Sequence, residues 1–78
     1  MQLVRKVPAR PIERRLNRRL FKEGLELKKC RVNSADYDRL GRYYVVDFTK
    51  GRLEAVDIEL DKWAEHEGAL GSHEVIAY

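Results

Sequence analysis

The sequence is poor in the residues that build disulfides, metal sites and membrane spans. Its 78 residues include one cysteine and two histidines. The single Cys30 cannot close a disulfide within the chain, which excludes a disulfide-stapled secreted mini-protein. His66 and His73 lie outside any metal-ligand spacing, so we expect no metal ion and no other cofactor. The longest apolar runs, Tyr43–Val46 and Val75–Tyr78, are four residues each, whereas a membrane span needs about 20.

The beginning of the sequence also lacks the apolar stretch of a signal peptide. We therefore expect a protein of the reducing cytoplasm with no membrane partner. A chain this short buries only about 60–65% of its unfolded surface, which allows one domain with one thin core. We expect neither an enzyme nor a small-molecule substrate, because little of the chain is left to enclose a deep catalytic pocket.

Charge is distributed unevenly along the chain. Residues 1–33 carry 11 Lys and Arg against 3 acidic residues, a net charge of +8. Residues 34–78 carry 5 against 10, a net charge of −5, which leaves +3 for the whole. The basic half favours an anionic partner on one surface. The same distribution also suits two halves that neutralise each other within the fold.

Apolar periodicity predicts an α+β fold, a single domain of order α-β-β-β-α. Ile12, Leu16 and Leu20 share one stripe of a predicted helix that begins at Pro11, and Gly24 is a typical helix terminator. Three strands are predicted next, and a second apolar stripe precedes Gly68. We expect a three-stranded antiparallel sheet with two helices on one face. The predicted strands are residues 25–31, 42–48 and 52–56, with a hairpin turn at 49–51 and a polar loop at 32–41.

We divide the chain into an N-terminal arm (1–10), the α-β-β-β-α domain (11–70) and a tail or added edge strand (71–78). The predicted strand at 42–48 is apolar on both faces, whereas the two helices cover only one of them. We therefore expect another segment or molecule to cover the second face. The candidates are the arm, the tail, a second copy of the chain and another partner. Tyr43 and Tyr44 are expected to fill the core. The alternative is a stacking surface for single-stranded bases, with Tyr37, Tyr43, Tyr44, Tyr78 and Phe48 as the candidates.

The first helix carries its cations opposite the apolar stripe. Guanidinium groups bind phosphate and carboxylate in a bidentate geometry, and a helix of this length covers several phosphates. Arg5, Lys6 and Arg10 of the arm would extend this surface further. The predicted nucleic-acid contacts are Arg14, Arg15, Arg18 and Lys22, with Lys28, Lys29 and Arg31 as secondary contacts.

Two resemblances accompany these patterns. The motifs RRL, GxxL, GRYYVVD and DIELDKWAEHEG, over roughly residues 14–68, resemble a group of short uncharacterised bacterial proteins, and this resemblance implies no site. The order α-β-β-β-α is similar to that of double-stranded-RNA-binding domains and of HicA-type mRNA-cleaving toxins. The toxins place a catalytic histidine on a central strand, and residues 42–48 contain none, which argues against that activity.

The sequence thus favours a small non-enzymatic module that binds RNA or DNA through its basic helix. The alternative is a protein-interaction module, either a phage-type regulator or inhibitor or a homodimer, that uses the two-sided apolar strand and the oppositely charged helices.

Overall fold

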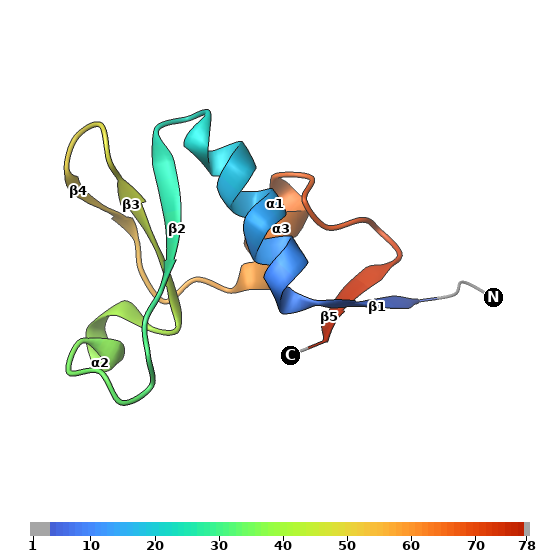
Figure 1. Ribbon diagram of the computed structural model, residues 1–78, viewed down its shortest axis with the longest axis horizontal. Coiled ribbons are helices and arrows are strands. Elements are labelled where there is room, and N and C mark those ends of the chain that lie inside the picture. Colours follow the sequence, from blue (N-terminus) through green and yellow to red (C-terminus); the bar gives the residue numbers. More distant parts are fainter. Residues whose placement is uncertain (1–3, 78) are drawn as a thin grey trace.

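The computed structural model describes residues 4–77, which form an α+β domain with one three-stranded sheet and one two-stranded sheet (Figure 1). Residues 1–3 of the predicted arm and residue 78 of the predicted tail lie outside this range. Every helix within the described range is too short or too polar to cross a membrane. The elements in chain order are β1 (Arg5–Pro8), α1 (Ala9–Phe21), β2 (Leu25–Lys29), α2 (Tyr37–Leu40), β3 (Tyr43–Asp47), β4 (Arg52–Ala55), α3 (Leu60–His66) and β5 (Glu74–Ala77).

The larger sheet has the order β2-β3-β4 and is antiparallel throughout, as predicted from the strand patterns. Leu27 pairs with Val45, and Val46 pairs with Leu53. A bulge between Val45 and Val46 shifts the register of β4. Along β3, buried residues alternate with half-buried ones, because successive side chains of a strand point to opposite faces.

The core lies between this sheet and the helices α1 and α3, which are on the same side of it, with α1 nearest β2 (Figure 1). The predicted stripe of Ile12, Leu16 and Leu20 is fully buried. It packs with residues that include Val45 of β3 and Leu60 of α3. The apolar side chains predicted from the helix pattern and from the strand pattern therefore pack in one core, as they do in other α+β domains.

The helix α1 begins at Ala9, two residues before the predicted start. The predicted helix start at Pro11 is therefore wrong. Pro8 is the N-cap residue, and Pro11 lies within the first turn. The first four N–H groups of a helix have no intrahelical acceptor, so a proline there loses no hydrogen bond. The consequence is that Arg10 belongs to the helix.

The arm and the tail pair with each other. Strands β1 and β5 form a parallel two-stranded sheet in which Arg5 lies opposite Glu74 and Pro8 opposite Ala77. This pair lies on the far side of α1 and α3 from the larger sheet (Figure 1). The described part of the tail is thus a strand, but it does not extend the three-stranded sheet. Neither β1 nor β5 covers the second face of β3. Buried Val7 joins β1 to the core.

The predicted polar loop contains the short helix α2, so the order is not a plain α-β-β-β-α. Leu40 at the end of α2 is buried, and Gly41 follows with a φ of +72°. A Cβ atom on Gly41 would lie 2.6 Å from the Cα of Asp57. Only glycine permits this contact between α2 and the segment that precedes α3. The sequence pattern did not predict α2, because Leu40 is its one buried residue and a single residue forms no apolar stripe.

The stripe on α1 leads to a stability prediction. Leu16→Ala removes a fully buried side chain and should lower the free energy of unfolding by about 2–5 kcal/mol, the usual cost of such a cavity. Urea unfolding followed by circular dichroism measures this change. Val32→Ala is the control, because Val32 is 67% exposed, and its effect should stay within about 0.5 kcal/mol. Equal effects of the two substitutions would contradict the placement of the core.

Candidate functional site

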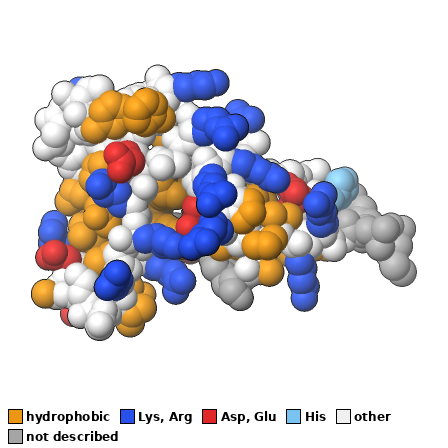
Figure 2. Space-filling view, in the orientation of Figure 1, with side chains coloured by type: hydrophobic (Ala, Val, Ile, Leu, Met, Phe, Trp, Pro, Cys, Tyr) orange, Lys and Arg blue, Asp and Glu red, His pale blue; other side chains and the backbone are white. Residues whose placement is uncertain are grey.

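Four cations form a row along the exposed side of α1. Arg10, Arg14, Arg18 and the C-cap residue Lys22 are all exposed. Each follows the previous one by four residues, so successive members lie on neighbouring turns and are rotated by about 40° around the helix. We call these four residues the cation row. It extends for about 18 Å along the helix axis at about 1.5 Å per residue. Figure 2 shows Lys and Arg side chains gathered over α1 and towards β2, beside a hydrophobic patch.

The acidic second half of the chain leaves the cation row without partners. Residues 4–77 contain five ion pairs, and none of them includes a member of the row. The helix α3 packs through buried Leu60 and Ala64, and its neighbouring Glu59 pairs with Lys62 at 3.1 Å. Within the described range, the expected alternative of neutralisation between the basic and acidic halves is limited to one ion pair, between Arg15 and Glu74.

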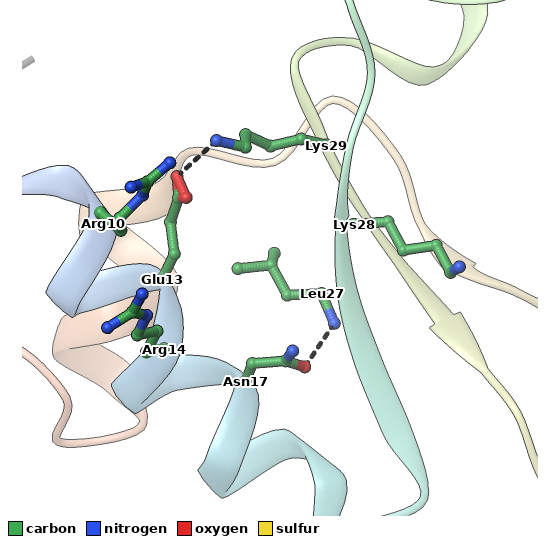
Figure 3. A pocket seen from close by; sticks show the side chains of 7 residues that line it. All are labelled: Arg10, Glu13, Arg14, Asn17, Leu27, Lys28 and Lys29. Carbon is green, nitrogen blue, oxygen red and sulfur yellow. Dashed lines mark hydrogen bonds and ion pairs between the residues drawn. The ribbon is translucent and has the colours of Figure 1, made fainter.

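A hollow of about 230 Å³ lies between α1 and β2 (Figure 3). The backbone N–H of Leu27 donates to Oδ1 of Asn17 at 3.0 Å, which ties β2 to the helix. At the other end, Glu13 pairs with Lys29 at 3.2 Å. The hydroxyl of Tyr43 also donates to Glu13, at 3.2 Å. The residues that line the hollow are Arg10, Glu13, Arg14, Asn17, Leu27, Lys28 and Lys29.

Tyr43 is held as a hydrogen-bond donor within this arrangement. Its side chain is buried, and this burial, followed by the negative charge of Glu13, raises the pKa of Tyr43 above its ordinary value. The phenol therefore stays protonated and donates to the Glu13 carboxylate. Tyr43 is a core residue, as predicted, and it also fixes the one acidic group in the hollow.

A second hollow, of about 410 Å³, lies on the other side of α1 against the segment before β5. Arg15 pairs with Glu74 at 3.6 Å, and Glu74 also accepts a hydrogen bond from the N–H of Gly71 at 2.8 Å. Arg18 and Lys22 of the cation row border this hollow as well. Its lining consists of Arg15, Arg18, Arg19, Lys22, Gly68, Ala69, Gly71 and Glu74.

The structure brings together some of the predicted contacts and separates others. All four predicted α1 residues lie on exposed turns of one helix, but Arg15 has a carboxylate partner. Lys29 points towards α1 and pairs with Glu13, whereas Lys28 points away from α1 (Figure 3) and pairs with Glu26 at 3.4 Å. Arg31 lies beyond the end of β2, in a separate hollow with Cys30 and Arg42.

Arg10 was expected to extend the surface from the arm, and the structure places it on the helix itself. Its spacing of four residues from Arg14 was visible in the sequence, but the expected helix start at Pro11 placed it in the arm. With the helix beginning at Ala9, Arg10 becomes the first member of the row.

Two aromatic rings stand at the C-terminal end of α1. Phe21 is 61% exposed and Phe48 is 43% exposed. Their centroids are 4.9 Å apart with an interplanar angle of 28°, a stacked arrangement. The N–H of Phe48 donates to the carbonyl of Gly24 at 3.1 Å, which joins the turn after α1 to the turn after β3.

Asp47 organises the turn that carries Phe48. Its Oδ1 accepts hydrogen bonds from the Thr49 hydroxyl at 2.6 Å, the Thr49 N–H at 3.1 Å and the Lys50 N–H at 3.0 Å. The hydrogen bond from the Thr49 hydroxyl contributes most to lowering the pKa of Asp47 below its ordinary value, and the hydrogen bond from the Lys50 N–H contributes next. The carboxylate is thus a structural acceptor of the β3–β4 turn.

Cys30, His66 and His73 do not gather into a site. Cys30 is a free, half-buried thiol, and both histidines are exposed. Within residues 4–77 no three His, Cys, Asp or Glu side chains are grouped so as to hold a metal ion.

No family model, curated protein or solved structure matches the chain. The resemblance to short bacterial proteins therefore stays a prediction, and functional inference rests on the geometry of the described residues.

The Asp47 turn predicts a pH dependence. Because the pKa of Asp47 is lower in the folded chain, its stabilisation is complete above the unfolded value of about 4. That stabilisation is lost as the pH falls through the lower folded value. The stability difference between the unaltered chain and Asp47→Asn should therefore be largest near neutral pH and shrink below about pH 4. Urea unfolding at a series of pH values measures it.

Thr49→Val provides the matched variant, because it removes the hydroxyl donor and keeps the shape of the side chain. It should raise the pKa of Asp47 towards the ordinary value and weaken the pH dependence. A difference between the unaltered chain and Asp47→Asn that stays constant from neutral to acid pH would refute this assignment.

Proposed function

We propose that this chain is a small non-enzymatic module that binds nucleic acid through α1. The cation row contacts the phosphates, and Arg15 and Arg19 border the same surface. The supporting observation is that all four members of the row lack a carboxylate partner within residues 4–77. The cytoplasmic setting expected from the sequence is part of this proposal.

The arrangement of the row suits a chain of phosphates. Like charges four residues apart destabilise a helix, and a polyanion that binds along the row removes this repulsion. The members are about 6 Å apart along the helix axis, and the row turns gradually around the exposed side of α1, from the hollow beside β2 to the hollow before β5. Arginine contributes three of the four cations, and its guanidinium group can donate two parallel hydrogen bonds to one phosphate.

The proposal predicts binding that depends strongly on salt. If four phosphates are engaged, the logarithm of the association constant should fall with the logarithm of the salt concentration with a slope of about −3.6 on duplex DNA, at about 0.9 per phosphate. Arg14→Glu combined with Arg18→Glu should weaken binding at low salt by at least about tenfold and flatten the slope. Fluorescence anisotropy with labelled RNA and DNA measures both quantities.

The matched control reverses the charge of two cationic residues elsewhere on the surface. Arg39→Glu combined with Lys62→Glu makes the same change in net charge at exposed positions on α2 and α3, and it should reduce affinity far less. Equal losses in the two double variants would show only a general charge effect. No binding by the unaltered chain at low salt would refute the proposal.

A second candidate is a protein-interaction module, acting as a regulator or inhibitor or as a homodimer. The observation that favours it is the second face of the larger sheet, which no other element within residues 4–77 covers. Tyr44 and Val46 on β3 are half-buried there, and Leu53 on β4 is 41% exposed.

This candidate predicts self-association through the sheet. Static light scattering should give a mass that rises with concentration for the unaltered chain, and Leu53→Lys should return it to that of a monomer. Leu16→Ala is unsuitable here because it alters the core. A monomeric mass at every concentration would exclude the second copy as the cover of this face.

A further inference from the structure

Phosphate binding alone does not explain the exposed aromatic pair of Phe21 and Phe48. Phe21 and Phe48 come from different elements, yet they stack at 4.9 Å with most of Phe21 exposed to solvent. Exposure of a large apolar ring forfeits the free energy that burial would give. Stacked rings of this kind provide a flat surface on which a further ring can stack.

The pair lies at the end of the basic surface. Phe21 follows Arg14 by seven residues and Arg18 by three, so it lies on their side of α1, within about two helical turns. Lys22 is the next residue, and Lys50 follows Phe48 in the turn. A nucleic-acid backbone held by the cation row therefore ends beside an aromatic surface.

The pair of Phe21 and Phe48 is held in place by the backbone around it. Phe48 is fixed by its hydrogen bond to Gly24 and by the Asp47 turn that follows. Gly24 has a φ of +79°, and a Cβ atom there would lie 2.9 Å from Cγ2 of Thr49. The two turns thus approach each other as closely as glycine allows, which positions Phe48 against Phe21 before any ligand binds.

We infer that this surface selects single-stranded nucleic acid, with an unpaired base stacked on Phe21 while Arg14, Arg18 and Lys22 hold the neighbouring phosphates. Bases of a duplex are stacked within the helix and do not offer a free face, whereas every unpaired base does. The inference rests on the proposed function and narrows its ligand class. RNA and DNA strands both supply the required phosphates and base faces, and the experiment separates them.

The test compares single strands with duplexes. The probes are a labelled deoxythymidine homopolymer, the matching uridine homopolymer, and a mixed-sequence duplex of equal length. Phe21→Leu keeps an apolar side chain but removes the aromatic face. It should weaken binding to at least one single strand by roughly tenfold to a hundredfold and leave duplex binding unchanged. Phe21→Trp should restore the affinity for single strands.

A spectroscopic readout separates stacking from a merely structural role. In Phe21→Trp, the added tryptophan should be quenched by single strands and not by the duplex. The unaltered chain, whose one tryptophan is Trp63, supplies the background signal. Leu53→Ala is the matched control, because it removes a comparably exposed apolar side chain from the second face of the sheet, and it should leave the affinity for single strands unchanged.

The outcomes distinguish this inference from the proposed function. If the unaltered chain binds and Phe21→Leu retains full affinity for both single strands, the stacking inference is overturned and phosphate binding stands. If the unaltered chain binds none of the probes at low salt, the proposed function is overturned and the inference falls with it. Urea unfolding of Phe21→Leu confirms that the variant is folded before either conclusion is drawn.

Discussion

The burial of one stripe of α1 determines where the charges of the molecule lie. Ile12, Leu16 and Leu20 are completely inaccessible to solvent, so the rotation of the helix about its axis is fixed. With that rotation fixed, the cation row can only face away from the core. Asn17 is placed beside β2 by the same rotation, where it accepts the N–H of Leu27. Core packing and surface charge are thus two consequences of one helical periodicity.

The charge pattern of α1 is unfavourable at its start and along the cation row, although Arg18 and Arg19 in the last turn favour the helix dipole. Its first turn contains no acidic residue but does contain Arg10, which opposes the helix dipole. Arg14 and Arg18 then follow at the spacing at which like charges repel. A helix that needed only solubility would be better served by glutamate at some of these positions. The repulsion within the row is the part of this pattern that the proposed polyanion would relieve.

Local patterns predicted the parts of the fold that depend on local physics. The α1 stripe, the hairpin of β3 and β4 and the helix α3 follow from side-chain periodicity, because each is formed by residues close in sequence. The pairing of β2 with β3 was expected because consecutive strands are usually neighbours. The pairing of β1 with β5 could not be predicted in this way, since Arg5 and Glu74 lie at opposite ends of the chain. The same limit applies to the site. The helical cations were recognisable, but the partners of Arg15, Lys28 and Lys29 depend on tertiary contacts.

The aromatic pair shows how a surface feature can depend on buried polar contacts. Phe48 follows Asp47, which is only 7% exposed and has its Oδ1 engaged by Thr49 and Lys50. Neutralising or removing that carboxylate loosens the turn, and a looser turn no longer holds the ring of Phe48 behind Phe21. Because a rigid stacking surface loses less entropy on binding than a mobile one, the Asp47 turn would favour the proposed base stacking without touching the ligand. The rigidity of the proposed platform therefore originates in the β3–β4 turn rather than in the two rings themselves.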